Sequence, residues 1–158
     1  MGTWGGEPIE WRVLNASGNT ALVISEYGLD CKLFNNDAYK GNSWYSSDLY
    51  DWLSNDFLTG AFTEEEQASI REVTCLSVDE AKTLFKDDDD RICYPTAYAR
   101  QQDVWGLCPT GSDGWWLRSP GRVSTHAVLV NHDGYVYSSG NYVNSSGLAV
   151  RPALILNL

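Results

Sequence analysis

The residues of this chain with the greatest capacity for chemistry are its two histidines, His126 and His132. Together with Ser124 and Asp133 they provide the residue types of a Ser-His-Asp site, and two imidazoles on neighbouring turns are also a ligand pair for a metal. No serine, however, lies in the Gly-x-Ser-x-Gly pattern of a nucleophile elbow. We therefore expect no catalytic residues and no enzymatic activity.

Two acidic runs, at positions 64–66 and 87–90, are the other candidates for a metal site. Glutamates directly after Thr63 are typical of the first turn of a capped helix, where acids lie at the positive end of the helix dipole. A calcium loop needs acids that alternate with other residues and a glycine at the bend. Consecutive aspartates do not converge on one ion in this way, so we expect a solvated loop at 87–90 and no metal.

The four cysteines are widely spaced and include no Cys-x-x-Cys pair, which does not favour zinc. Two interpretations stay open: buried reduced thiols, which behave as small apolar side chains, or disulfides in an exported protein. The cysteines are Cys31, Cys75, Cys93 and Cys108. Gly5 and Gly6 are not followed by a helical pattern, and no phosphate-binding loop or dinucleotide motif occurs elsewhere. We expect no cofactor.

The residues from Trp115 to Pro152 form a tract of unusual composition, in which apolar anchors and glycines frame clusters of small polar residues and tyrosines. From Leu117 onward there is no Lys, Glu, Gln, Met or Trp, although these types make up about a fifth of the residues before it. No codon that ends in a pyrimidine encodes any of them, so the tract fits codons randomised at their first two positions. A tyrosine- and serine-rich β-surface, from which strands exclude Lys and Glu, explains the same absence.

Strands are expected to position this tract, because valines alternate with polar residues along it. The valines predicted to be buried are Val128, Val130, Val136, Val143 and Val150. The positions predicted to be accessible and to lie on one face are 122–126, Tyr135, Tyr137, Tyr142 and 144–146. Residues 131–134 are expected to form a tight turn, since Asp-Gly supplies the positive φ angles that such a turn requires. Residues 138–141, Ser-Ser-Gly-Asn, are expected to form a second turn.

Four large residues at the ends of the tract are expected to be structural: Trp115, Trp116, Arg118 and Arg151. An alternative for the two indoles and Arg118 is a platform on which a sugar stacks. Fixed aromatic residues beside strands are more often core, and each arginine is expected to pair with a buried carboxylate or with main-chain carbonyls.

The elements before the tract are expected to be strands and short helices. Residues 9–14 and 20–25 alternate apolar and polar types around an Asn-, Ser- and Gly-rich turn, which predicts a hairpin. Residues 27–42 are expected to form a long loop, and 73–76 and 153–158 to form strands.

Helices are expected from residues 46–48, with a serine or aspartate as the cap, to residues 59–60, after Thr63 and Ser77, and for one or two turns after Pro95. Together these elements predict an α+β fold of mixed antiparallel sheets, with two to three helices in the amino-terminal half.

A chain of 158 residues is expected to form a single domain, residues 1–158. Its net charge of −10 argues against nucleic acid and anionic membranes as partners. No stretch approaches the roughly 20 apolar residues that span a bilayer, and no secretory signal is present. A cell-surface or secreted location would require a signal that precedes this sequence; otherwise a cytoplasmic location is expected.

Several segments resemble a bacterial domain family of unknown function, the DUF6273 family. They are WWLRSPG at 115–121 and VRPAL at 150–154, with PIEWRVL, ALVISEYGL and CYPTAYA earlier in the chain. Some members of this family are similar to the variable proteins of diversity-generating retroelements, which have a C-type lectin-like fold and carry adenine-mutagenised codons on a ligand-binding face. The formylglycine-generating enzymes share a related fold but use cysteines late in the chain, and none follows Cys108 here.

This resemblance implies a C-type lectin-like fold, a variable ligand-binding region within residues 115–152, and an unknown protein or glycan as the ligand. The positions that correspond to the variable ones are Arg122, Val123, Ser124, Thr125, His126, Leu129, Asn131, His132, Asp133, Tyr135, Tyr137, Ser138, Ser139, Asn141, Tyr142, Asn144, Ser145 and Ser146. The alternative is a non-diversified structural or adaptor module, or a carbohydrate-binding module, of the same fold.

Overall fold

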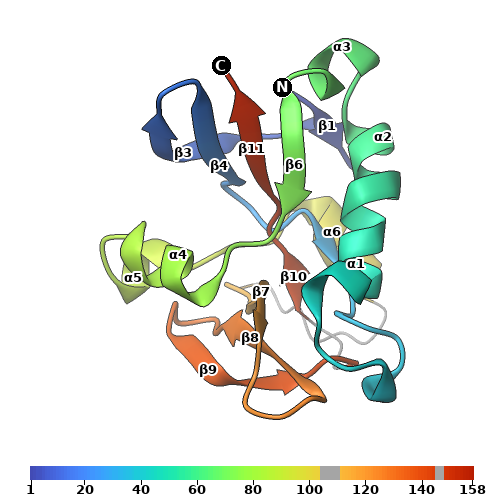
Figure 1. Ribbon diagram of the computed structural model, residues 1–158, viewed down its shortest axis with the longest axis vertical. Helices are drawn as coiled ribbons and strands as arrows, with labels where there is room; N and C mark the ends of the chain where they lie inside the picture. Colours follow the sequence, from blue (N-terminus) through green and yellow to red (C-terminus); the bar gives the residue numbers. More distant parts are fainter. Residues whose placement is uncertain (104–110, 145–147) are drawn as a thin grey trace.

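The structure is a computed structural model that describes residues 1–103, 111–144 and 148–158. These residues form an α+β fold with two main sheets, one above the other in Figure 1, and a helical column beside both. The upper sheet has four strands and the lower sheet five. A separate two-stranded ribbon, β1 (Thr3–Trp4) and β2 (Glu7–Pro8), precedes the upper sheet in the chain.

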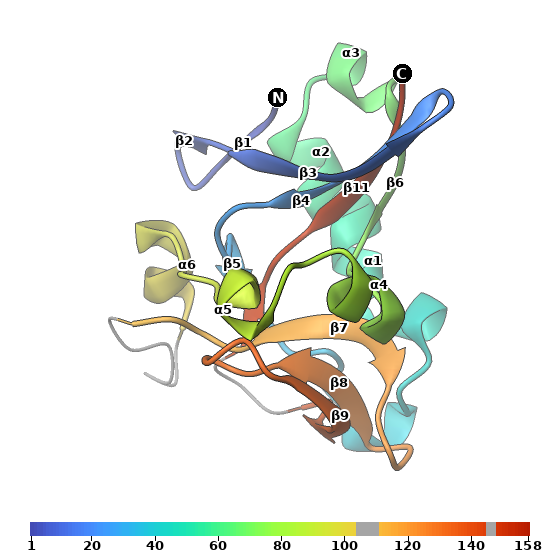
Figure 2. The same cartoon turned by 90° about the vertical axis from the view of Figure 1, so that its left-hand side faces the viewer.

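The upper sheet combines the two ends of the chain. β3 (Trp11–Ser17) and β4 (Thr20–Ser25) form the expected hairpin, with Gly18 at a φ of 59° in the turn. β11 (Ala153–Asn157) pairs antiparallel with β4 on one side and with β6 (Ile70–Thr74) on the other. The carboxy-terminal strand is therefore an inner strand, and both termini lie at the same end of the molecule (Figures 1 and 2).

The alternation predicted for residues 9–14 holds only in part, because Val13 is 65% exposed. β3 is an outer strand, and its register against β4 shifts between Val13 and Asn15. Such a bulge leaves one residue without a partner and interrupts the period of two that the prediction assumed.

The helical column runs along both sheets (Figure 1). α1 (Asp48–Trp52), the π-helical turn η3 (Leu53–Phe57) and α2 (Leu58–Ala61) follow one another without a break. Of the serines and the aspartate expected to cap this helix, Ser47 is the cap, since its hydroxyl accepts a hydrogen bond from Tyr50 N at 3.0 Å. The predicted end at 59–60 is slightly early, because the last helical residue is Ala61.

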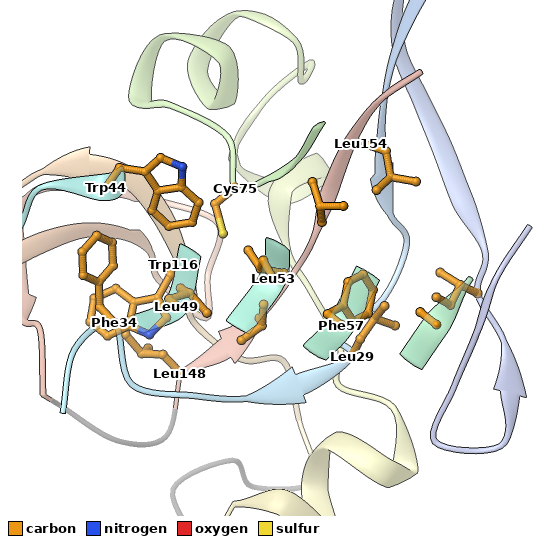
Figure 3. Close-up of a cluster of buried hydrophobic side chains, with 14 of the residues drawn as sticks. Leu29, Phe34, Trp44, Leu49, Leu53, Phe57, Cys75, Trp116, Leu148 and Leu154 are labelled. Atoms are coloured by element: carbon orange, nitrogen blue, oxygen red, sulfur yellow. The ribbon is translucent and has the colours of Figure 1, made fainter. Parts of the chain in front are cut away.

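The column buries one side chain per turn in the main hydrophobic cluster. Leu49, Leu53 and Phe57 are each exposed by no more than 1%. Figure 3 shows Phe34 and Trp116 at one end of this cluster, from which it continues along the helix past Leu53 to Phe57. The helix thus contributes to a core that both sheets share.

Two short helices begin with the capping boxes expected from the sequence. Thr63 and Glu66 close the box of α3 (Glu64–Gln67), and each side chain bonds the other residue's main-chain N–H. Ser77 does the same for α4 (Val78–Thr83).

The expectation of a loop at 87–90 is wrong, because α5 (Asp88–Arg91) is one helical turn capped by Asp87. Acids are stabilised at a helix amino terminus, so the aspartate run favours a helical turn as much as a loop. α6 (Ala97–Gln102) follows Pro95 as expected, with Thr96 as its cap.

The segment 27–42, expected to be a loop, contains β5 (Asp30–Cys31) and the 3-10 turn η1 (Ala38–Lys40). A second 3-10 turn, η2 (Trp44–Ser46), connects it to α1. Phe34 in this segment is fully buried, whereas Leu33 is only half-buried.

The described cysteines do not form disulfides with one another. Burial raises the pKa of the Cys75 thiol to about 12 and that of Cys93 to about 11. Cys31 Sγ lies 3.4 Å from Leu148 O. Cys108 lies outside the described residues.

The lower sheet contains the tract singled out in the sequence. β7 (Trp115–Pro120), β8 (His126–Val130) and β9 (Val136–Tyr142) form an antiparallel meander. β10 (Ala149–Val150) pairs in parallel with β7 and antiparallel with β5, so the order is β5-β10-β7-β8-β9 and the sheet is mixed.

The turn predicted at 131–134 is present: Gly134 has a φ of 83°, and its N–H donates to Asn131 O at 2.9 Å. The turn predicted at 138–141 is wrong, because these residues lie within β9. Gly140 does have a positive φ, 79°, but it lies where the register against β8 shifts. A Cβ on Gly140 would meet Ala127 O at 2.6 Å, so glycine serves a bulge here rather than a turn.

Gly134 provides a first testable prediction. A Cβ on Gly134 would lie 1.7 Å from Asp88 O, whereas a Cβ on Gly18 would meet nothing within 4 Å. Both residues have positive φ, so the conformational cost of alanine, about 1–2 kcal/mol, applies to each. We expect Gly134→Ala to lower the free energy of unfolding by about 1–3 kcal/mol more than Gly18→Ala in urea denaturation. Equal losses in the two variants would contradict this close approach.

Candidate ligand-binding surface

Most of the described residues predicted to bind a ligand lie around β9, an outer strand of the lower sheet. They come from the β7–β8 connection, from the β8–β9 turn, and from β9 with the residue pair after it. Figure 2 shows this region at the end of the molecule opposite the two termini. We call the described part of these segments, residues 121–126 and 131–144, the β9 surface.

Most side chains of the β9 surface are accessible to solvent. The exposed ones are Arg122, Val123, Ser124, His132, Asp133, Tyr135, Tyr137, Ser138, Ser139, Tyr142 and Asn144. Thr125, His126, Asn131 and Asn141 are half-buried, and Ser145 and Ser146 lie outside the described residues. The three tyrosines are 54%, 42% and 55% exposed at positions 135, 137 and 142.

The buried side of the predicted alternation is also as expected. Val128, Val130, Val136, Val143 and Val150 are each exposed by no more than 4%. Tyrosines and valines therefore separate into surface and core along β9.

Leu129 does not belong to the accessible set: it is 5% exposed and lies in the main hydrophobic cluster. Residues 127–130 of β8 are all buried, because this inner strand of the lower sheet is covered on both faces. Along such a strand, alternate residues lie on opposite faces, but both faces are buried. The alternation therefore does not identify an exposed face. Leu129 is therefore a core residue and not a ligand contact.

Main-chain hydrogen bonds fix the backbone beneath the exposed side chains. Gly121 N donates to His126 O at 2.8 Å, and Arg122 N donates to Ser139 O at 2.9 Å. Val143 N donates to Thr125 O at 2.8 Å. The β7–β8 connection is thus attached to β9 without the participation of its own exposed side chains.

Asn42 provides a further support from a distant part of the chain. Its Nδ2 donates to His126 O at 2.9 Å and to Val123 O at 3.2 Å. Sequence reasoning missed this residue, because a single Asn in a segment without periodicity carries no local signal of a long-range contact.

His126 pairs across the strands with Tyr142, and their rings lie 4.4 Å apart, centroid to centroid. Thr125 Oγ1 lies 3.0 Å from His126 Nδ1. Asp133 instead follows the opposite end of β8, where its Oδ1 accepts from Tyr135 N at 3.1 Å. The structure therefore does not bring Ser124, His126 and Asp133 together as a Ser-His-Asp site.

The β8–β9 turn is held by α5. Arg91, which is 6% exposed, donates from Nε to Gly134 O at 2.8 Å, and its guanidinium also pairs with Asp88. The exposed residues around the turn, Tyr135 among them, therefore project from an anchored backbone.

The two tryptophans are core residues. Trp115 and Trp116 are both fully buried, and they belong to different hydrophobic clusters because adjacent strand residues point to opposite faces. Trp115 Nε1 donates to Arg91 O at 3.1 Å, and Trp116 Nε1 donates to Lys32 O at 2.9 Å. Neither ring is available as a stacking platform for a sugar.

Arg118 forms a two-pronged ion pair with Glu80, at 2.6 and 3.1 Å, and also donates to Cys75 O at 2.7 Å. Burial alone would raise the pKa of Glu80, but the hydrogen bonds from Arg118 and from Ser77 N outweigh it and hold this pKa below its ordinary value. Arg118 thereby attaches α4 to β7.

Arg151 lies between β10 and β11, where the chain passes from the lower sheet to the upper one. Its side chain is fully buried and donates to three main-chain carbonyls: Ser25 O at 2.8 Å, Glu26 O at 3.2 Å and Arg91 O at 3.4 Å. Its guanidinium also lies 5.0 Å from the ring centroid of Trp115. Burial lowers the pKa of Arg151 from its ordinary value.

Within residues 1–103, 111–144 and 148–158, no group of three or more His, Cys, Asp or Glu side chains is arranged to hold a metal ion. In the same residues, no helix combines the length and the apolar character that a membrane crossing requires.

The fold and this surface define an α+β protein with an exposed, tyrosine-rich outer strand. The chain belongs to the family described as Domain of unknown function (DUF6273), whose sequence model matches residues 18–83 and 75–158. No curated protein and no solved structure matches the chain.

Proposed function

We propose that this protein is a non-catalytic ligand-binding protein, the variable protein of a diversity-generating retroelement, and that the β9 surface is its diversified face. We further propose that its α+β fold is of the C-type lectin-like type, in which strands from the two ends of the chain pair. The pairing of β4 with β11 supports this assignment. The ligand is a protein or glycan on the surface of a phage or another cell.

The observation that carries this proposal is the separation of side chains along β9 and its connections. Tyr135, Tyr137 and Tyr142 are exposed, whereas Val136 and Val143 next to them are buried. Tyrosine provides a large contact area at low entropic cost, and Ser and Asn provide adaptable hydrogen bonds, as in antibody loops.

The fixed backbone is a second support. Because main-chain groups and Asn42 hold the β7–β8 connection, exposed side chains can change without loss of the bonds beneath them. A tract that diversifies by mutation needs exposed side chains that can be replaced without disturbing the backbone that carries them.

A sevenfold variant tests the proposal, with each Tyr changed to Ser, each His to Asn, each Asn to Ser and each Ser to Asn. The changed positions are Ser124, His126, Asn131, His132, Tyr137, Tyr142 and Ser145. Ser124, His132, Tyr137 and Tyr142 are exposed, and exposed substitutions usually cost within about 0.5 kcal/mol each. With the half-buried His126 and Asn131 changed as well, we expect a cooperative melt with a loss of a few kcal/mol at most. On arrays of glycans and of purified phage and bacterial surface proteins, parent and variant should bind different members.

Retention of the parent's binding profile by the sevenfold variant would contradict the assignment of the face. At the genetic level, we expect a near-copy of the region that encodes residues 122–146 beside a reverse-transcriptase gene, differing from it only at adenines. Differences spread over all four bases would contradict diversification.

A further inference from the structure

A cavity of about 310 Å³ lies outside the β9 surface, where η1 and η2 meet the first turns of the helical column. This region is at the foot of α1 in Figure 1. Its walls include Lys40 from η1, Tyr45 from η2, and Tyr50, Asp51 and Asn55 from the column. This volume is at the lower end of the range of small-molecule sites.

Aromatic contacts hold two tyrosines of this cavity in place. The Tyr50 ring packs against Trp44, with centroids 5.5 Å apart, and against Tyr45, with centroids 5.1 Å apart and ring planes at 83°. Tyr45 is 70% exposed, so it offers an apolar ring surface to a ligand. Within the part of the chain that the structure describes, neither phenol hydroxyl forms a hydrogen bond.

The charged and amide groups of the cavity are also oriented. Asp48, another wall residue, pairs with Lys40 and accepts from Asn36 N at 2.8 Å. Asp51 Oδ1 accepts from Asn55 Nδ2 at 3.0 Å. Asn55 Nδ2 also donates to Asp51 O at 2.9 Å, so both of its hydrogens are used within the protein. The two carboxylates and the Asn55 side-chain oxygen keep lone pairs for a further donor, while Lys40 keeps hydrogens for a further acceptor.

We propose that this cavity is a binding site for a small neutral polyol, with a monosaccharide ring as the natural size. Donors and acceptors are interspersed on its walls, and a hydroxyl group is the ligand group that serves both at once without net charge. An anion would meet Asp48 and Asp51, whereas the charge of Lys40 is already paired with Asp48. The Tyr45 ring provides the apolar contact for the C–H face of such a ring.

The cavity uses none of the residues of the β9 surface, so it does not depend on the proposed function. A second cavity of about 210 Å³ has Asp48 as a common wall residue and is also lined by Lys32 and Trp52.

The test is a titration of the ¹⁵N-labelled protein with the methyl glycosides of glucose, mannose and galactose, with sorbitol, and with tetramethylammonium as a cationic control. We expect at least one neutral probe to shift the amide signals of Tyr45, Tyr50 and Asn55, with millimolar affinity. Tyr50→Phe removes one hydroxyl and keeps the packed ring, so it should weaken this binding about three- to tenfold.

Tyr94→Phe is the matched control, because it makes the same chemical change at an exposed tyrosine outside both the cavity and the β9 surface and should leave the affinity unchanged. Four results would overturn the proposal: no amide shift with any neutral probe, shifts centred on Tyr137 and Tyr142, equal affinity in Tyr50→Phe, or a response to tetramethylammonium alone. Sugar binding that survives the sevenfold variant separates this site from the β9 surface, whatever becomes of the proposed function.

Discussion

Replacing Trp116 with alanine is expected to lower the free energy of unfolding by about 3–5 kcal/mol, as other truncations of buried aromatic residues do. The indole is fully buried, packs on Phe34 with centroids 5.7 Å apart, and donates to Lys32 O at 2.9 Å. Alanine would leave a cavity in the cluster of Figure 3 and an unpaired carbonyl beside it.

Tyr142→Ala is the companion variant, since it also truncates an aromatic residue but at a site that is 55% exposed. We expect it to change stability by no more than about 0.5 kcal/mol. Thermal and urea unfolding of both variants measure the contrast. If Trp116→Ala unfolds like the parent while Tyr142→Ala is strongly destabilised, framework and surface have been assigned the wrong way round.

Arg151→Met is expected to cost about 3–5 kcal/mol, because it leaves three buried carbonyls without their charged donor. Methionine retains most of the apolar stem of arginine, so the lost free energy of unfolding comes mainly from removal of the guanidinium. Arg151→Lys keeps the charge but lacks the planar fork that reaches Ser25, Glu26 and Arg91 at once, so it should restore stability only in part.

Arg71→Met is the control for this pair, because Arg71 lies on β6 with an exposed side chain and should change stability by about 0.5 kcal/mol or less. Urea denaturation measures all three arginine variants. If Arg151→Met loses no more stability than Arg71→Met, contact of the methionine with Trp115 and Phe85 compensates for the lost hydrogen bonds to the carbonyls. The guanidinium of Arg151 would then not be needed to stabilise the junction between the two sheets.

Local chemistry made much of the fold predictable from the sequence. The boxes at Thr63 and Ser77 are closed by residues only three positions away, and Asp-Gly at 133–134 contains its own turn signal. The alternation correctly predicted that Val136 and Val143 are buried, because exposed residues lie next to each of them along this outer strand.

The failures arise where distant residues decide the outcome. Gly140 signals a positive φ, but only its partner strand determines whether that angle makes a turn or a bulge. Leu129 lies on an inner strand whose two faces are both covered. A period of two in the sequence separates the two faces but does not show that both are buried. The cavity beside Tyr50 depends on the approach of η1 and η2 to α1, and no spacing in the sequence encodes it.

The inner position of β11 has a consequence for how the protein is made. β4 and β6 cannot be joined until residue 157 has left the ribosome, which at about 5–20 residues per second follows the emergence of β4 by about 7–26 s. During that interval the edge of β4 that later receives β11 carries unpaired main-chain groups beside Val23, and the edge of β6 does so beside Val73 once residue 74 has emerged. The nascent chain is therefore most prone to strand exchange with neighbouring copies before β11 is synthesised, and we expect a chaperone that covers these edges to raise the yield of folded protein.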